Sequence, residues 1–292
     1  MMTATRNYLA VDLGAESGRT MVGSLDGKHL RLTETHRFAN VPVRLPDGLH
    51  WDVLRLWSEM KAGVAISSAK VEGGLQSIGI DTWGVDFALL DGQGGLLSNP
   101  FHYRDERTDG MFEEAFQRMS REEIFANTGI QFMQLNTLYQ LLAMSVEKSP
   151  LFEVARTFVT IPDLFNYWLS GEITNEFTNA TTTQCFDPRK RDWAQRVLDA
   201  MNIPSHFFRA VTEPGTPIGV LLPPVAEETG AGGVQIVVPA CHDTGSSVVA
   251  VPAQNQDFAW ISSGTWSILG AEVREPCVND RALGYNFTNE GG

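Results

Sequence analysis

The chain has 292 residues, of which 43% are hydrophobic and 20% are charged, a composition typical of a globular protein of roughly two domains. Its 35 acidic and 22 basic residues give a formal net charge of -13, which argues against nucleic acid or an anionic membrane as a partner. Since no segment approaches a membrane span, no apolar leader opens the chain and the three cysteines are scattered, we expect a reduced cytoplasmic protein without structural zinc or disulfides.

Hydrophobic periodicity predicts an alternation of strands and helices along the chain. In chain order the pattern predicts three strands within about 7–37, a helix at 52–70, strands at 78–82 and 85–90, helices near 111–128, 136–147, 162–170 and 192–200, a strand at 236–240, a helix starting near Asp243, and a strand–turn–strand at 259–269.

The turn between the first two strands is the most informative of these elements. A short apolar run ends on Asp12, and a turn of small residues follows. Because Gly14 and Gly18 carry no Cβ, the backbone N–H groups of this turn can approach an anion closely. Asp12 can hold a metal ion, directly or through water. The pattern indicates a site for the phosphates of a magnesium–nucleotide complex, although an ordinary glycine turn has the same composition.

A second turn of this kind, Ser263–Gly264–Thr265, lies between apolar strands near the other end of the chain. Two phosphate-sized turns far apart in sequence suggest a duplicated fold with one nucleotide held between two lobes, while a simple turn is the alternative. The chain has no Walker-type loop, dinucleotide fingerprint or nucleophile elbow, so a nucleotide would have to be bound by these hairpins.

Eight segments occur in one order from end to end of the chain. They are VDLGAESGR at 11–19, GIDTWGVDF at 79–87, YRD at 103–105, NTLYQ at 136–140, NATTTQ at 179–184, HDT at 242–244, SSGTWS at 262–267 and TNEGG at 288–292. Together they resemble the FGGY carbohydrate kinases and, within that family, the rhamnulokinases.

This resemblance implies an α/β chain with an actin-like, ribonuclease H-like ATPase fold. Residues 1–245 are expected to form the N-terminal sugar-binding lobe, and residues 246–292 the beginning of a C-terminal ATP-binding lobe. Family members carry a much longer second lobe, so this lobe is expected to be incomplete and truncated. We therefore expect the chain alone to bind ATP weakly and to turn over little.

The resemblance also implies the reaction, which is transfer of the γ-phosphoryl group of ATP to the 1-hydroxyl of L-rhamnulose with Mg²⁺ as cofactor. The match at 83–86 favours this sugar kinase over a glycerol or xylulose kinase, but the residues do not rank L-rhamnulose against L-fuculose or L-xylulose. Two alternatives stay open. One is a nucleotide-dependent sugar-binding or switch protein of the actin-like superfold without kinase activity, and the other is a catalytically inactive sugar-binding relative.

Asp243 is the candidate general base. It lies between a strand and a helix start, at an open end of the sheet, where ligands gather in α/β folds. A carboxylate there can accept the proton of the attacking sugar hydroxyl late in a loose phosphoryl transfer. The alternative is a plain helix N-cap. The resemblance favours catalysis and implies that His242 and Thr244 flank the sugar.

The remaining sugar contacts are expected after the strand at 78–82. Gly84 lets the backbone approach a ligand, and the indole of Trp83 offers a face suited to sugar C–H surfaces. Asp86 can bond sugar hydroxyls, and Arg104 is expected to reach the sugar. The structural alternatives are a core tryptophan, an aspartate that ends strand pairing and a surface ion pair of little energetic value.

The expected nucleotide contacts lie in the two hairpins. Asp12 would bind Mg²⁺ through water, since Mg²⁺ sheds its water reluctantly. Arg19 would help to neutralise the phosphate charge, and Glu16 either points to solvent or helps to hold the metal. The residues assigned to the phosphates are Gly14, Ala15, Glu16, Ser17, Gly18 and Arg19 in the first hairpin and Gly264 and Thr265 in the second.

Overall fold

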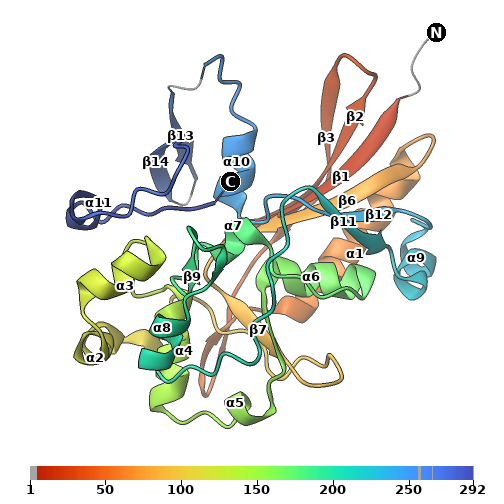
Figure 1. The fold of residues 1–292 in the computed structure, drawn as a ribbon. Coiled ribbons are helices and arrows are strands. Elements are labelled where there is room, and N and C mark those ends of the chain that lie inside the picture. Colours follow the sequence, from red (N-terminus) through yellow and green to blue (C-terminus); the bar gives the residue numbers. More distant parts are fainter. Residues whose placement is uncertain (1–4, 256–257, 265, 292) are drawn as a thin grey trace.

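A six-stranded mixed sheet forms the centre of the computed structural model, which describes residues 5–255, 258–264 and 266–291 (Figure 1). Its strands are β1 (Arg6–Leu13), β2 (Ser17–Leu25), β3 (Leu30–Ala39), β6 (Leu75–Thr82), β11 (Thr216–Val220) and β12 (Gln235–Val238). Their spatial order is β11-β12-β6-β1-β2-β3. Because β1, β6 and β12 run parallel, their carboxyl ends meet at one edge of the sheet.

Three helices pack on one face of this sheet and form the first apolar core with it (Figure 1). They are α1 (Val53–Lys70), α6 (Ile161–Ser170) and α9 (Pro223–Thr229). The carboxylate of Asp52 accepts the N–H of Arg55 at 3.1 Å and starts α1, as expected for an aspartate N-cap. Met60 and Val64, one turn apart, are fully buried against the sheet.

A second apolar core lies among shorter helices and is joined to the first by the strand pair β7–β8. The strands are β7 (Phe87–Leu90) and β8 (Thr157–Thr160), and the helices are α2 (Met111–Arg118), α3 (Arg121–Thr128), α4 (Thr137–Val146), α5 (Leu151–Val154) and α8 (Gln195–Ala200). The short helix α7 (Phe177–Ala180) packs with Phe186 in a small separate cluster. Along β7, Ala88 and Leu90 enter the first core, while Phe87 and Leu89 enter the second. Strand alternation therefore ties the two cores together.

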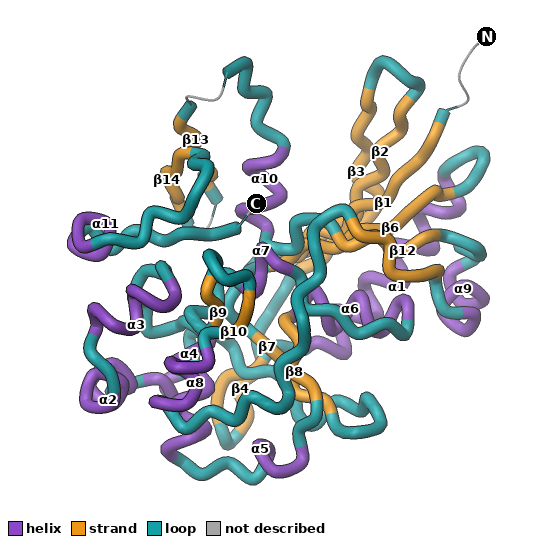
Figure 2. The backbone as a smooth tube through the Cα atoms, in the orientation of Figure 1, coloured by secondary structure: helices purple, strands orange, loops and turns teal. Residues whose placement is uncertain are grey.

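The residues that follow β12 lie beside this body. They form α10 (Asp243–Val249), the hairpin β13 (Ala259–Ser263) and β14 (Ser267–Ala271), and α11 (Asp280–Gly284). Figure 2 shows the hairpin as a separate two-stranded unit that long loops connect to α10 and α11. Ala282 and Leu283 of α11 join the second core next to α3, which anchors this part of the chain.

Most predicted elements are confirmed, with two corrections. The helical pattern at 111–128 forms two helices, because Ser120 is extended and its hydroxyl oxygen accepts the N–H of Glu123 at 3.2 Å. The helix predicted for 192–200 starts at Gln195, since β10 (Asp192–Trp193) pairs with β9 (Phe186–Asp187). The elements not predicted are β4 (Val43–Leu45), β5 (Gly48–His50), a 3-10 turn (Glu106–Thr108), α5, β8, α7, β9, β11, α9 and α11.

Among the described residues, no helix combines the length and the apolar character that crossing a membrane requires.

Candidate functional site

Three carboxylates come together at the carboxyl edge of the parallel strands. Asp12 on β1 is the register partner of Asp81 on β6, so both side chains project from the same face of the sheet. The neighbouring residue Thr82 forms a parallel bridge with His242, which brings Asp243 to the same edge. Burial and the charges of Asp12 and Asp243 raise the pKa of Asp81 well above its ordinary value. Asp81 was not predicted, although its position at a strand end was a usable signal.

Asp12 forms an ion pair with Arg19, the residue expected to help neutralise the phosphate charge. Its Oδ2 accepts hydrogen bonds from Arg19 Nε at 2.8 Å and Nη2 at 2.5 Å, and the two residues are register partners on β1 and β2. Both side chains remain partly exposed, 45% for Arg19 and 27% for Asp12. This ion pair therefore lies at the accessible surface of the edge.

Hydrogen bonds within the turn and from Asn40 fix the conformation of the first turn. The N–H of Gly14 donates to the carbonyl of Ser17 at 2.9 Å, and Asn40 donates to the carbonyls of Gly14 and Glu16, both at 2.9 Å. A Cβ on Gly18 would lie 2.3 Å from the Phe38 ring, so this glycine is required by packing under the turn. Ala15 packs against the first core, and Glu16 is exposed.

Asp243 is the first residue of α10 and is not its N-cap, which is His242. The Asp243 carboxylate accepts the N–H of the neighbouring Thr244 at 2.6 Å and remains 40% exposed. Burial raises the pKa of Asp243, the His242 ring opposes that rise, and Asp12 adds to it. The plain N-cap interpretation is thus not supported, and the carboxylate is accessible. Thr244 itself is 7% exposed.

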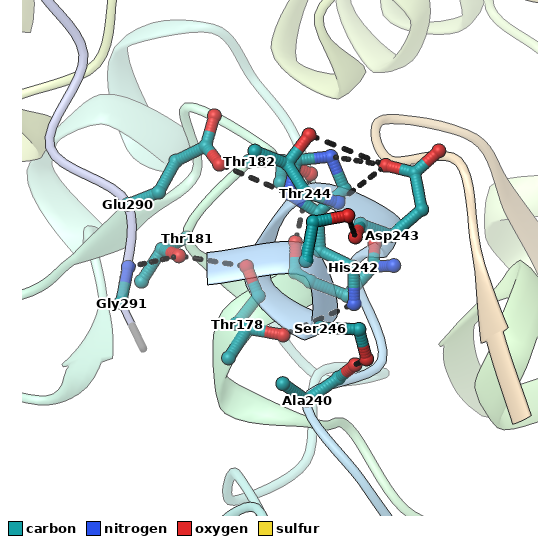
Figure 3. A network of polar contacts seen from close by, with 12 residues as sticks. Thr178, Thr181, Thr182, Ala240, His242, Asp243, Thr244, Ser246, Glu290 and Gly291 are labelled. Carbon is teal, nitrogen blue, oxygen red and sulfur yellow. Dashed lines mark hydrogen bonds and ion pairs between the residues drawn. The ribbon is translucent and has the colours of Figure 1, made fainter. Parts of the chain in front are cut away.

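His242 is buried beside Asp243 and close to a second carboxylate (Figure 3). Its Nε2 lies 3.4 Å from Asp243 Oδ1, and its Nδ1 lies 2.9 Å from Glu290 Oε2. Burial alone would lower the pKa of His242, but Glu290, followed by Asp243 and Glu176, raises that pKa to about 9. The two flanking carboxylates therefore favour the protonated, cationic form of the ring. The sequence pattern includes Glu290 in the segment at 288–292 but does not predict its contact with His242.

Asp86 lies beneath the surface and its acceptor positions are occupied. Its Oδ2 accepts the indole N–H groups of Trp51 at 2.6 Å and Trp83 at 2.9 Å, and its Oδ1 accepts the Gln140 amide at 2.8 Å. It is 1% exposed, and burial raises its pKa to about 6. This geometry does not support a direct bond from Asp86 to a sugar hydroxyl. Trp83, which is 5% exposed and packed on Trp51 with ring centroids 3.9 Å apart, is largely a core residue.

The backbone between Trp83 and Asp86 has an unusual conformation. Val85 has φ of 68°, a left-handed conformation that is rare for a β-branched residue. Its carbonyl accepts bonds from Thr137 Oγ1 at 2.5 Å and Gln140 Nε2 at 3.3 Å, and its N–H donates to Thr182 Oγ1 at 3.1 Å. A Cβ on Gly84 would lie 3.0 Å from Thr182. The tertiary structure thus imposes this turn, as is common at functional sites.

Arg104 lies on the wall of an open hollow. The hollow has a volume of about 390 Å³ and is lined by Tyr103, Arg104, Asp105, Glu106, Thr108, Asp109, Met133, Gln134 and Leu135. The Arg104 guanidinium lies 5.4 Å from the centroid of the Tyr103 ring. Burial raises the pKa of Tyr103, a side-chain hydrogen bond with Trp266 lowers it, and the charge of Glu16 raises it. Trp266 and Glu16 belong to the two hairpin turns, so both turns lie close to this segment.

In the second hairpin, the N–H of Gly264 donates to the carbonyl of Trp266 at 2.8 Å. Thr265, the other predicted phosphate contact, lies outside the described residues. Among the described residues, no three His, Cys, Asp or Glu side chains are grouped closely enough to hold a metal ion. Asp12 still fits Mg²⁺, which is commonly bound by one or two carboxylates together with water and substrate phosphates.

The chain is similar to known proteins in sequence and in fold. Residues 7–250 match the N-terminal domain of the FGGY family of carbohydrate kinases. Similar curated proteins include the rhamnulokinase of Oceanobacillus iheyensis, 44% identical over 97% of this chain and 60% of that protein, and the rhamnulokinase of Halalkalibacterium halodurans, 43% identical over 98% and 61%. This chain therefore spans about 60% of the length of the curated relatives it matches.

Solved structures show the same fold. The xylulose kinase of Lactobacillus acidophilus superposes with a TM-score of 0.84 at 18% identity, over 95% of this chain and 56% of that chain. The glycerol kinase of Plasmodium falciparum with ADP gives 0.75 at 17% identity, over 91% and 54%. The expected α/β fold of the actin-like ATPase type is confirmed by these neighbours.

Proposed function

Because this chain belongs to the FGGY family of carbohydrate kinases, we propose that it carries the sugar site of an ATP-dependent kinase that phosphorylates the 1-hydroxyl of L-rhamnulose. The observation that carries the proposal is the Asp243 carboxylate, 40% exposed at the sheet edge next to the Asp12 turn. In this proposal, residues 1–245 form the sugar-binding lobe and residues 246–292 belong to the ATP-binding lobe. The protein would act in the cytoplasm, where ATP is available.

Asp243 acts as the general base in the proposed reaction. As the 1-hydroxyl oxygen bonds to the γ-phosphorus, its proton passes to the Asp243 carboxylate, and the bond from the γ-phosphorus to the bridging oxygen breaks to release ADP. Mg²⁺ near Asp12 would neutralise phosphate charge during the transfer. The cation at His242 supports the ionised form of Asp243, because a nearby positive charge favours a carboxylate over a carboxylic acid.

The sugar is proposed to bind between the Trp83–Gly84 turn, Arg104 and the segment from His242 to Thr244. Arg104 supplies an exposed charged donor at the hollow, and Gly84 supplies backbone without a side chain. Asp86 does not contact the sugar in this proposal, but its hydrogen bond with the indole N–H of Trp83 fixes the orientation of that ring. L-fuculose and L-xylulose are the competing ketoses to test against L-rhamnulose.

The phosphates are proposed to bind between the two hairpins. The first turn, from Gly14 to Arg19, would take the β- and γ-phosphates, and Gly264 and Thr265 would approach from the second. In the structure, Arg19 is paired with Asp12 at 2.5 Å. When the nucleotide binds, this ion pair would separate, with Arg19 binding a phosphate and Asp12 binding Mg²⁺.

Replacing Asp243 with Asn tests the proposal. We expect kcat with ATP and L-rhamnulose to fall by about 10²–10⁴, the usual scale for loss of a general base, with the sugar KM little changed. The assay uses a longer gene product that contains this chain, because the chain alone is expected to turn over little. A wild-type protein that binds L-rhamnulose and ATP without forming ADP would support the sugar-binding or switch alternative instead. Near-wild-type turnover in Asp243→Asn would remove Asp243 from the mechanism.

A further inference from the structure

The segment after α11 returns to the sheet edge and brings a carboxylate to His242 (Figure 3). Asn286 accepts the N–H of Phe132 at 2.8 Å, and Asn289 donates to the carbonyl of Gly129 at 2.7 Å. The N–H of Gly291 donates to Thr181 Oγ1 at 2.9 Å. Glu290 lies between these anchors, so its backbone position is fixed from both sides.

The His242 ring lies between the carboxylates of Glu290 and Asp243. Glu290 Oε2 is 2.9 Å from Nδ1, so the carboxylate forms an ion pair in direct contact with the ring. The His242 side chain is 10% exposed and that of Glu290 24%. At this burial, solvent screens the attraction less than it would between fully exposed side chains.

Other charged groups face this pair from the elements around it. Glu176, the N-cap of α7, acts on the ring, but its carboxylate already accepts the N–H groups of Thr178 at 2.8 Å and Asn179 at 2.9 Å. Asp81 on β6 interacts with both His242 and Asp243, and Asp12 on β1 acts on Asp243. Glu290 is therefore the carboxylate that contacts the ring from the side opposite the base.

We propose that Glu290 is a positioning residue for the base, because it holds the His242 ring as a cation beside the Asp243 carboxylate. This inference rests on the proposed function of Asp243. Without Glu290, only Asp243 and Glu176 would oppose burial, which favours the neutral imidazole. Asp243 would then lose its neighbouring positive charge while the negative charge of Asp12 remained, and a base that is protonated at neutral pH cannot accept the substrate proton.

The inference is tested by titrating the histidine side chains of the 292-residue chain by NMR, with the His242→Asn spectrum assigning the signal. In the wild type, we expect His242 to titrate at about 9. In Glu290→Gln, the pKa of His242 should fall clearly below that of the wild type, because the carboxylate in contact with the ring is removed. Glu290→Asp keeps the charge on a shorter side chain and should give an intermediate value. Glu275→Gln, an exposed glutamate of the same C-terminal segment, is the matched control and should titrate as the wild type.

This titration does not depend on kinase activity, so it can fail while the proposed function stands. A wild-type His242 that titrates at or below 6.5 would overturn the inference, even if Glu290→Gln did not fold. An equal pKa in wild type and folded Glu290→Gln would overturn it as well. In a gene product that shows kinase turnover, Glu290→Gln should raise the apparent pKa on the acid side of the kcat–pH profile by about one unit. The KM for the sugar should change by less than about twofold. A lower kcat with an unmoved profile would contradict a positioning role.

Discussion

Asp86 and Asp243 are two aspartates of the candidate site that the structure treats in opposite ways. Asp86 is 1% exposed, and its carboxylate accepts two indole N–H groups and a side-chain amide. Asp243 is 40% exposed, its carboxylate accepts hydrogen bonds from its neighbour Thr244, and the His242 imidazole lies beside it. The difference teaches that a carboxylate with filled acceptor positions supports the fold, while one left open at a strand edge is available for chemistry.

The largest expected effect is the loss of stability in Asp86→Ala. The substitution removes the buried acceptor of the indole N–H groups of Trp51 and Trp83 and one of the acceptors of the Gln140 amide. We expect the free energy of unfolding to fall by about 3–5 kcal/mol, as for other broken buried charge networks. Urea denaturation measures it.

The matched variant for that experiment is Asp243→Ala, which removes the same side chain from the open edge. Its carboxylate bonds to the adjacent Thr244, so the free energy of unfolding should change by no more than about 1 kcal/mol. Similar losses in the two variants would break the comparison and make Asp243 a structural residue.

The second prediction concerns the pH dependence of stability. Burial raises the pKa of Glu176 to about 7 from its ordinary value of 4.5, so the folded state binds more protons than the unfolded state between these values. The contribution of Glu176 to the free energy of unfolding is therefore highest at low pH and falls as pH rises through this window. Relative to Glu176→Gln, the wild type should lose about 1–3 kcal/mol across it.

Urea denaturation at a series of pH values measures this difference. The exposed Glu153→Gln is the matched control and should follow the wild type at every pH. A difference in the free energy of unfolding between wild type and Glu176→Gln that stays constant with pH would mean that Glu176 remains ionised in the folded protein throughout this window. Burial alone would then not be enough to raise the pKa of a carboxylate that accepts several hydrogen bonds.

The sequence predicted the site best where the chemistry follows from position along a strand. Asp12 and Asp243 lie at strand ends, and the parallel sheet brings them to one edge. The partners of Asp86 were out of reach, because Trp51 and Gln140 are 35 and 54 residues away in the chain. For this reason Asp86 was assigned to the sugar.

A glycine in a turn can be required for the approach of a ligand or for close packing, and the sequence does not distinguish the two at Gly18. Gly18 was assigned to anion approach, whereas a Cβ there would collide with Phe38, a contact that depends on the pairing of β2 with β3. Glu290 reaches His242 from 48 positions further along the chain by way of α11, and no local pattern encodes that path. Local chemistry was therefore readable from the sequence, and the tertiary partners that modify it were not.

A third, smaller effect concerns the strained turn that precedes Asp86. At most positions, glycine is less stable than alanine by about 0.5–1 kcal/mol, because it has more freedom in the unfolded chain. Val85 has φ of 68°, where alanine carries a steric penalty and glycine does not. We expect Val85→Gly to be more stable than Val85→Ala by about 1 kcal/mol, a reversal of the usual order.

The same pair of substitutions at Val64, buried within α1, is the control for Val85 and should show the usual order, with glycine less stable. Thermal or urea unfolding of the four variants measures both differences. If alanine were the more stable residue at Val85, the turn would not be strained, and the network around Asp86 would not be needed to hold it.

The smallest effect on stability, and a clear one on function, is expected for Arg104→Ala. Arg104 is exposed at the hollow, so removing its side chain should change the free energy of unfolding by no more than about 0.5 kcal/mol. If its guanidinium bonds the sugar, the KM for L-rhamnulose should rise by about 10–100-fold while the KM for ATP changes little, since a charge-assisted hydrogen bond contributes about 1.5–3 kcal/mol. Arg196→Ala, which removes an exposed arginine paired with Glu123, should change neither KM. Equal increases in both KM values would place Arg104 outside the sugar site, and a large loss of stability would group it with the filled network around Asp86.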